Sequence, residues 1–220
     1  MIPAAGSGRR LAADAPKQYA ELAGRTMLWH AIRAVCVPPV QTVFVVLAPD
    51  DERFAQEDWD AFEGRVEPLY CGGASRRDSV YNGLMASSDE VLADDWVLVH
   101  DAARPCLPPQ DLKTLVSECE NDDIGGILAI PIAETVKRAL QDRIARTEDR
   151  KPLWLAQTPQ MFRAGLLLQA LQRARGTVTD EASAVEQMGL KPKIVAGSRE
   201  NIKVTWPEDL AMAESILQRR

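Results

Sequence analysis

The sequence predicts an α/β protein with a doubly wound, mostly parallel sheet. Short apolar runs rich in β-branched residues alternate along the chain with longer segments of helical periodicity. Glycine-rich and charged segments follow several of these runs, at the position where the carboxyl ends of parallel strands form a ligand crevice. We expect all 220 residues to form one domain, because a chain of this length buries a substantial core.

The individual elements follow from local patterns. Proline pairs at 38–39 and 108–109 end one helix and open another, and the runs TVFVVLA and WVLVH are buried strands by composition. Only Met1 and Ile2 precede the first loop, so we expect its strand to be very short or to continue further upstream. The other expected strands cover 42–48, 66–71, 96–100 and 193–196, and the expected helices cover 26–37, 110–119, 163–175, 180–188 and the segment from 207 onward, with a further helix opening after Gly73.

The alternation is interrupted in the second half of the chain. After Gly125 and Gly126 the strand-like pieces ILAIPIA and TVKRAL follow each other closely, and a charged stretch occupies 141–151. This pattern predicts a hairpin-like excursion. We expect a protruding arm at about 131–153.

Composition excludes several classes of protein. The formal net charge of −6 argues against a nucleic-acid binder, which usually presents a basic surface to many phosphates. No apolar run approaches the ~20 residues of a membrane helix, and the first residues lack a secretory pattern, so we expect a cytoplasmic protein. The cysteines form no CxxC pair and with two histidines complete no zinc motif, so we expect reduced thiols at Cys36, Cys71, Cys106 and Cys119.

The segment PAAGSGRR, residues 3–10, predicts a phosphate-binding loop. Gly6 and Gly8 allow backbone amides to approach an anion, and Arg10 and Lys17 neutralise its charge. The segment lacks the third glycine of a dinucleotide-binding fingerprint and the Lys and Ser or Thr of a Walker loop. A tight turn with solvated basic residues is the alternative.

Four further segments are candidates for the same site. Asp101 follows the strand WVLVH, where its carboxylate is either a magnesium ligand or a structural hydrogen-bonding group. In GGASRRDSV, residues 72–80, the glycines allow backbone approach to a flat base, with a simple turn and N-cap as the alternative. Asp180 in TDEASA and Lys203 in NIKVT lie at element boundaries, and Lys203 is either a phosphate ligand or a charge on a sheet face.

Eight segments in order resemble one known family. They are PAAGSGRR, PKQY, GGASRRDSV, VHDAARP, TVKR, TPQMF, TDEASA and NIKVT, and together they cover nearly the whole chain. This set is similar to the 2-C-methyl-D-erythritol 4-phosphate cytidylyltransferases of the non-mevalonate isoprenoid pathway. The resemblance implies a Rossmann-like nucleotidyltransferase fold with a small β-arm for dimerisation. It also implies transfer of CMP from CTP to 2-C-methyl-D-erythritol 4-phosphate, with magnesium as cofactor and release of pyrophosphate.

The resemblance also implies roles for individual residues. Asp101 binds the magnesium, and Arg10 and Lys17 stabilise the transition state. Lys203 and Arg150 position the methylerythritol phosphate, and Arg150 and Thr135 are supplied across the interface of a homodimer. The residues implied to hold CTP are Pro3, Ala4, Ala5, Gly6, Gly8, Gly73, Ser79 and Ala102, and those implied to contact the acceptor are Thr135, Arg104, Thr179, Asp180 and Thr205.

The expected chemistry needs no catalytic His or Cys. The nucleophile would be a phosphate monoester, whose second pKa near 6 leaves it largely ionised at neutral pH without a strong general base. The enzyme then has to position two highly charged substrates and to disperse charge on the α-phosphate and the leaving pyrophosphate, for which Lys, Arg and magnesium are suited. The alternatives are a cytidylyltransferase for another polyol phosphate such as ribitol 5-phosphate, and a non-catalytic nucleotide-sensing module. Parallel turnover assays with the two acceptors distinguish the first alternative from the expected enzyme. Pyrophosphate release on mixing CTP with acceptor distinguishes the second, because a sensing module releases none.

Overall fold

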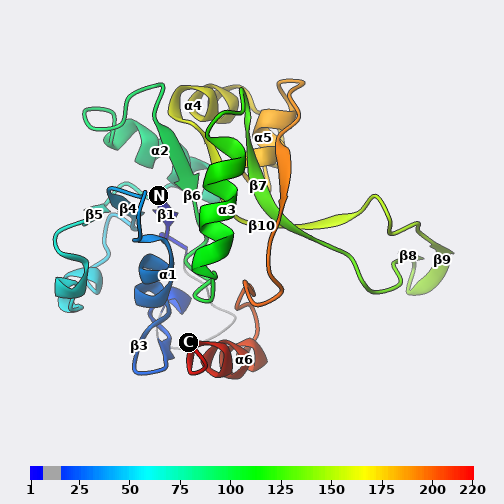
Figure 1. The fold of residues 1–220 in the computed structure, drawn as a ribbon, viewed down its shortest axis with the longest axis horizontal. Helices are drawn as coiled ribbons and strands as arrows, with labels where there is room; N and C mark the ends of the chain where they lie inside the picture. Colours follow the sequence, from blue (N-terminus) through cyan, green and yellow to red (C-terminus); the bar gives the residue numbers. More distant parts are fainter. Residues whose placement is uncertain (7–15) are drawn as a thin grey trace.

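The computed structural model describes residues 1–6 and 16–220 and shows an α/β body from which one β-arm extends (Figure 1). The expected alternation of strands and helices is confirmed. The body strands are β1 (Ile2–Pro3), β4 (Val43–Val46), β5 (Val66–Leu69), β6 (Trp96–Val99), β7 (Gly125–Pro131), β10 (Trp154–Arg163) and β11 (Lys193–Ala196). The α-helices are α1 (Met27–Val35), α2 (Arg76–Ala86), α3 (Pro109–Cys119), α4 (Ala164–Arg173), α5 (Glu181–Glu186) and α6 (Pro207–Leu217).

Met1 joins two groups of strands into one continuous sheet. One group has the order β1-β4-β5 and the other β11-β7-β10-β6. The Met1 amino group donates to the Leu98 carbonyl at 2.7 Å, and the His100 amide donates to the Met1 carbonyl at 3.0 Å. This is the pattern of a parallel pair between Met1 and Val99. The expected short first strand therefore lies in the middle of the sheet, between β4 and β6.

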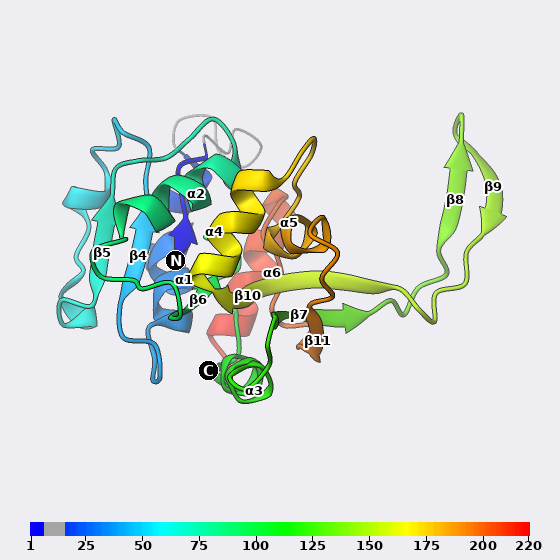
Figure 2. The same ribbon diagram turned by 90° about the horizontal axis from the view of Figure 1, so that it is seen from above.

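The burial of strand β4 shows that the sheet is covered on both faces. Its four residues are all buried, and successive side chains point to opposite faces. Val43 and Val45 pack into the core beneath α1 and α3, whereas Phe44 and Val46 pack into the core beneath α2, α4 and α5. Figure 2 shows these helices on the two sides of the sheet. The doubly wound fold expected from the sequence is thus confirmed.

Strand β10 runs against the general direction of the sheet. It is antiparallel to both of its neighbours, β6 and β7, whereas the pairs β1–β4, β4–β5 and β7–β11 are parallel. The sheet is therefore mostly parallel, as expected. The sequence pattern does not indicate β10, because Gln157, Thr158 and Gln160 interrupt its apolar residues, and its pairing with β7 shifts register between Ala156 and Gln160.

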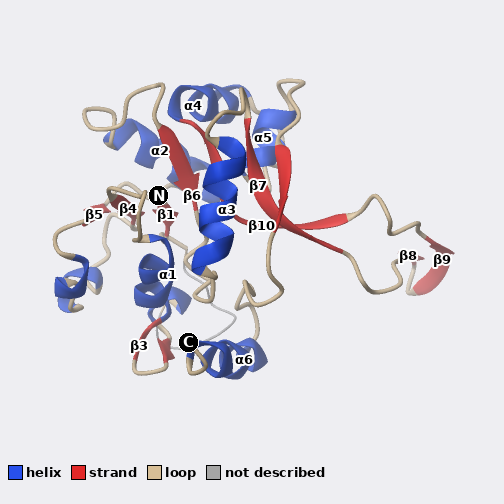
Figure 3. Cartoon of the chain, in the orientation of Figure 1, coloured by secondary structure: helices blue, strands red, loops and turns tan. Residues whose placement is uncertain are grey.

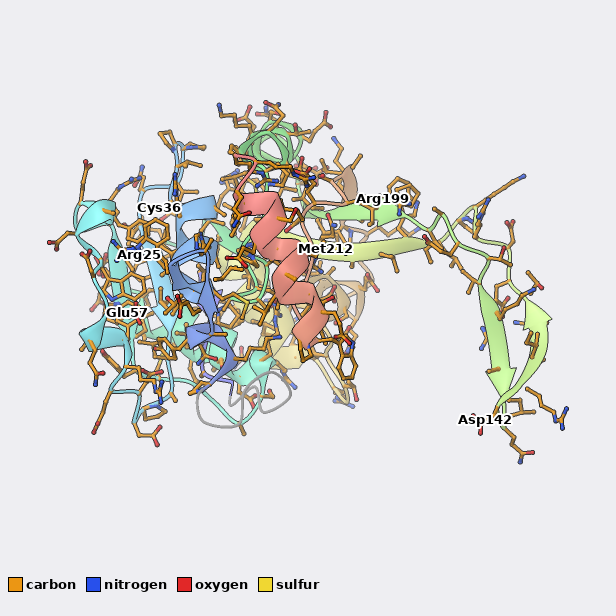
Figure 4. The ribbon with its side chains drawn as sticks, turned by 90° about the horizontal axis from the view of Figure 1, so that it is seen from below. Arg25, Cys36, Glu57, Asp142, Arg199 and Met212 are labelled. Carbon is orange, nitrogen blue, oxygen red and sulfur yellow. The ribbon has the colours of Figure 1, made fainter. Side chains whose placement is uncertain are left out.

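The arm lies between β7 and β10 and carries its own hairpin of β8 (Lys137–Leu140) and β9 (Arg143–Thr147). Figure 3 shows this hairpin well away from the body, and Figure 4 places Asp142 at its far end. The two strand-like pieces ILAIPIA and TVKRAL do form strands, but they do not pair with each other. The first pairs with β10 inside the body, and the second pairs with β9 from the charged stretch.

Short elements complete the fold. They are the 3-10 helices η1 (Lys17–Tyr19), η2 (Phe54–Gln56) and η3 (Asp60–Phe62) and the two-stranded pair β2 (Glu21–Leu22) and β3 (Arg25–Thr26). A small apolar cluster, including Met27, Val204 and Ile216, packs α6 against the segment after β6. Within the described residues, none of the helices has the length and apolar character needed to cross a lipid bilayer.

Candidate active site

A cavity of about 560 Å³ lies where several parallel strands end. The segment after β1 forms one wall, the start of α2 a second, and the segment after β6 a third, as expected for a crevice at strand carboxyl ends. We call it the first cavity. It is lined by Pro3, Ala4, Ala5, Gly6, Lys17, Gln18, Met27, Gly73, Ala74, Ser75, Arg76, Ser79, Asp101, Ala102, Ala103 and Lys203.

The start of α2 has the N-cap that was one of the two alternatives for GGASRRDSV, and it also lines the first cavity. Ser75 is the N-cap, since its side chain accepts from the Asp78 amide at 3.1 Å, and the same residue lines the first cavity. The glycines serve close packing within the protein. A Cβ at Gly72 would lie 2.2 Å from the Ala5 Cβ, and one at Gly73 would lie 2.4 Å from the Asp78 Cβ. These glycines therefore allow α2 and the segment after β1 to form adjacent walls.

Lys17 and Gln18 also line the first cavity, and their side chains hydrogen-bond to the backbone around it. The Lys17 ammonium donates to the Val204 carbonyl at 2.7 Å, across 187 positions of the chain. The Gln18 amide donates to the Ala4 carbonyl at 2.6 Å and fixes the backbone next to the glycine loop. Residues from three distant parts of the sequence thereby hold one another beside this cavity.

Asp101 is the centre of a cluster of opposite charges. Its Oδ1 lies 3.0 Å from the Arg76 Nε, its Oδ2 lies 2.8 Å from the Lys203 Nζ, and the Arg104 Nε lies 3.7 Å from Oδ2. Burial by itself would raise the pKa of this carboxyl, but Arg76 and Lys203 outweigh burial and hold the pKa well below its usual range. Asp101 is therefore ionised at neutral pH.

A second cavity, of about 220 Å³, adjoins the first. Arg76, Asp101 and Lys203 line both, so these three residues mark the junction. The remaining lining comes from the segment after β6, from β10 and from the residues just before α5, and comprises Arg104, Ala156, Gln157, Thr158, Gln160, Thr179 and Asp180.

His100 orients a hydroxyl of the second cavity. Its Nε2 lies 3.0 Å from the Arg104 carbonyl oxygen, so Nε2 carries the proton and Nδ1 accepts from the Thr158 hydroxyl at 3.1 Å. The Thr158 oxygen in turn accepts from the Asp101 amide at 2.9 Å. Thr158 therefore offers the cavity only an acceptor. Burial lowers the pKa of His100 to about 4, which keeps the ring neutral.

Other polar residues beneath the second cavity serve the scaffold. The two terminal nitrogens of Arg104 donate to the Asn201 and Ala156 carbonyls, at 2.7 and 3.3 Å. The Asp180 carboxylate caps α5 by accepting from the Ser183 amide at 3.0 Å, and its other oxygen accepts from the Gln160 amide at 2.8 Å. Both residues thus line the cavity with most of their hydrogen-bonding groups directed at protein.

The donor set fits a magnesium ion that completes its shell with phosphates and water. Asp101 provides the one carboxylate of the first cavity among the described residues, and Mg²⁺ commonly takes one or two carboxylates in phosphate sites. A cage made of protein groups alone does not fit, because the described part of the chain contains no cluster of three His, Cys, Asp or Glu side chains.

Most of the expected site residues come together at the two cavities. Thr205 lines neither cavity, and its amide donates to the Asp209 carboxylate at the start of α6. Thr135 and Arg150 belong to the arm between β7 and β10 and line neither cavity of their own chain, and an Arg150 terminal nitrogen donates to the Ala133 carbonyl. Gly8 and Arg10 lie outside the described residues. Those at the cavities are Pro3, Ala4, Ala5, Gly6, Lys17, Gly73, Ser79, Asp101, Ala102, Arg104, Thr179, Asp180 and Lys203.

Sequence reasoning missed several lining residues. The local pattern indicates Arg76 only as a residue at the start of a helix, and it assigns no role to Gln18, Thr158 or Gln160. The available signal was the TPQ segment itself, which places polar residues inside an apolar strand. Buried polar side chains in a strand at a ligand crevice indicate a site or a scaffold for one.

The protein has an α/β fold with two adjoining cavities at the carboxyl ends of its parallel strands. The family model of 2-C-methyl-D-erythritol 4-phosphate cytidylyltransferase, IspD, matches residues 1–219. A relative of this name from Dechloromonas aromatica is 52% identical over 222 aligned residues, which cover 100% of this chain and 97% of the relative. One from Nitrosomonas eutropha is 49% identical, with 100% and 96% coverage. The chain belongs to the IspD family of cytidylyltransferases.

Solved structures agree with this assignment. A crystal structure of 4-diphosphocytidyl-2C-methyl-D-erythritol synthase superposes with a TM-score of 0.85 at 41% identity, covering 98% of this chain and 95% of that one. The cytidylyltransferase of Thermus thermophilus gives a TM-score of 0.79 at 29% identity, with 99% and 97% coverage. A bifunctional IspD/IspF enzyme of Albidiferax ferrireducens matches this whole chain at 49% identity over 53% of its own length.

Proposed function

We propose that this enzyme transfers CMP from CTP to 2-C-methyl-D-erythritol 4-phosphate. An oxygen of the acceptor phosphate forms a bond to the α-phosphorus of CTP, and the bond from that phosphorus to the bridging oxygen of the β-phosphate breaks. Pyrophosphate leaves, and 4-diphosphocytidyl-2-C-methyl-D-erythritol is formed. The observation that carries the proposal is the pair of cavities joined at Arg76, Asp101 and Lys203, in a chain of the IspD family.

The first cavity would hold CTP and the second the acceptor. The larger volume, the backbone of residues 3–6 and the start of α2 suit a nucleotide with its phosphates. The smaller volume, with hydroxyl and amide groups, suits a polyol phosphate. No general base is needed, because a phosphate monoester is already largely ionised at neutral pH.

The lysines and arginines would disperse the charge of the reacting phosphates. Lys17 and Lys203 both line the first cavity, and we assign Lys17 and Arg10 to the transition state and Lys203 to the acceptor phosphate. Asp101 would hold a magnesium ion, which when bound screens the triphosphate and polarises it. Lys203 would then lose its carboxylate partner and face the phosphates, and Arg76 would lose its contact with Asp101 but keep its pair with Glu181.

We further propose that the enzyme is a homodimer that shares its sites. Thr135 and Arg150 lie on an arm that extends from the body and do not line the cavities of their own chain, so a neighbouring subunit is the natural recipient. In a twofold dimer each arm would reach the partner's site. We also propose one domain over 1–220 and a cytoplasmic location, which the four free cysteines favour.

Pyrophosphate release tests the proposed function. Purified enzyme is mixed with CTP, magnesium and 2-C-methyl-D-erythritol 4-phosphate, and we expect release only when all three are present. Parallel reactions with ribitol 5-phosphate and with each component left out are the controls. Equal or faster turnover of ribitol 5-phosphate, or no pyrophosphate with any acceptor, would contradict the proposal.

A further inference from the structure

Arg76 occupies a position between the two cavities for which helix stability gives no reason. It is the first residue of α2, where the positive end of the helix dipole disfavours a cation. Its side chain is 28% exposed and lines both cavities. An arginine at this point faces the place where a nucleotide and an acceptor would meet.

The guanidinium is held in one orientation by Glu181. Its two terminal nitrogens bind the two carboxylate oxygens of Glu181 at 2.5 and 3.0 Å, in a bidentate pair. Glu181 is only 1% exposed and begins α5, which anchors it to the body. Arg76 is therefore an arginine whose geometry is fixed before any ligand binds.

The guanidinium retains hydrogen-bonding capacity toward the cavities. An arginine has five N–H donors, and three of those of Arg76 bind Glu181 and Asp101. Among the described residues, the other two have no protein partner. Because the side chain is partly exposed at both cavities, these donors are available to a phosphate.

The charged side chains around the junction favour binding of an anion. Three cations, Arg76, Arg104 and Lys203, surround two carboxylates, Asp101 and Glu181, so this group of five has one net positive charge. The carboxylate of Asp180, which also lines the second cavity, accepts hydrogen bonds from Gln160 and Ser183. Arg104 directs both terminal nitrogens at backbone carbonyls. Arg76 and Lys203 are therefore the cations of this cluster that face the junction.

We infer that Arg76 is a further catalytic residue, which contacts the α-phosphate of the nucleotide while it passes from pyrophosphate to the acceptor. This inference rests on the proposed cytidylyl transfer. A preoriented guanidinium at the junction stabilises negative charge on the equatorial phosphate oxygens without reorganising during the reaction. Glu181 positions it, so the pair acts as one unit.

Substitution of Arg76 tests the inference, with Arg77 as a matched control. Arg77 is the next residue on α2, but it donates to the Leu171 carbonyl and lines neither cavity. We expect Arg76→Gln to lower kcat by about a hundredfold while the dissociation constant for CTP changes by less than about fivefold. Arg77→Gln should keep kcat within about threefold of the wild type. A kcat of Arg76→Gln within about tenfold of the wild type would overturn the inference.

A double variant separates catalysis from structure. Arg76→Gln leaves the buried Glu181 carboxylate without its partner, which alone could disturb the fold. Arg76→Gln/Glu181→Gln removes both charges, so its thermal midpoint should return toward the wild-type value while kcat stays as low as in the single variant. Recovery of kcat together with stability would show that Arg76 only neutralises Glu181, and the inference would be wrong.

If both glutamine variants fail to fold, a conservative variant still tests the inference. Arg76→Lys keeps a positive charge beside Glu181 and Asp101 but cannot form the bidentate pair, so we expect at least about a tenfold loss of kcat. Unchanged kcat in this variant would also overturn the inference. The wild-type reaction, measured alongside, distinguishes this outcome from failure of the proposed function, in which the wild type itself releases no pyrophosphate.

Discussion

The Lys203 ammonium lies 2.8 Å from the Asp101 carboxylate and joins the segment before α6 to the end of β6. Within the same carboxylate, the other oxygen binds Arg76 at 3.0 Å. These two cations hold the pKa of Asp101 well below its usual range, so the carboxylate is ionised at neutral pH.

Replacement of Asp101 by Asn should remove most of the activity without unfolding the enzyme. Asn is nearly isosteric and keeps one oxygen toward either Lys203 or Arg76, but it carries no charge and is a weak ligand for Mg²⁺. Initial rates at limiting magnesium, with thermal unfolding as the control for folding, provide the measurement. Undiminished turnover of Asp101→Asn at limiting magnesium would mean that another group holds the metal.

Lys17→Ala should lower kcat more than it weakens CTP binding. We assign Lys17 to charge that develops in the transition state, and loss of such a contact typically costs on the order of 3 kcal/mol, roughly a hundredfold in rate. Because the Lys17 ammonium also donates to the Val204 carbonyl, Lys17→Gln is the matched variant, since it retains a donor without the charge. A hundredfold weaker CTP affinity with normal kcat would instead make Lys17 a ground-state ligand.

Mixed dimers test the sharing of sites between subunits. Lys17→Ala and Arg150→Ala should each be nearly inactive, because each removes a group from every site. Denatured together in equal amounts and refolded, they should give about half heterodimers, each with one intact site, so that roughly a quarter of wild-type activity returns. If Arg150 acted within its own chain, the mixture would stay as inactive as its parents even with heterodimers confirmed by mass.

His100 should make the enzyme less stable as the pH falls from about 6.5 to about 4. Its pKa is about 4 in the folded protein and ordinarily near 6.5, so the unfolded chain binds more protons in this window. The difference corresponds to on the order of 3 kcal/mol of unfolding free energy, present above the unfolded pKa and lost as the pH falls.

Denaturant unfolding at several pH values between 4 and 7 measures this effect. His100→Asn should show a flatter dependence of the unfolding free energy on pH than the wild type. Some dependence should remain, since burial also lowers the pKa of His30. Identical slopes for the two proteins would contradict the assignment of a neutral, buried ring.

Local patterns were sufficient for most secondary elements. The β-branched run at 42–48 and the proline pair at 108–109 predicted β4 and α3, because strand composition and helix initiation depend on neighbouring residues. β10 could not be predicted in this way. Gln157, Thr158 and Gln160 are buried there only because distant groups, among them His100, Asn201 and Asp180, provide hydrogen bonds for them or their neighbours.

The sequence alone determined the fold class and the family and indicated most of the segments that line the two cavities, since each depends on ordered local motifs. The tertiary structure decided how those motifs meet. Arg76, Asp101 and Lys203 lie in three separate motifs, and only folding shows that they mark the junction of two cavities. The physical reason is that charge pairing depends on distance in space, and strand order, which brings β1 between β4 and β6, is set by contacts between residues far apart in the chain.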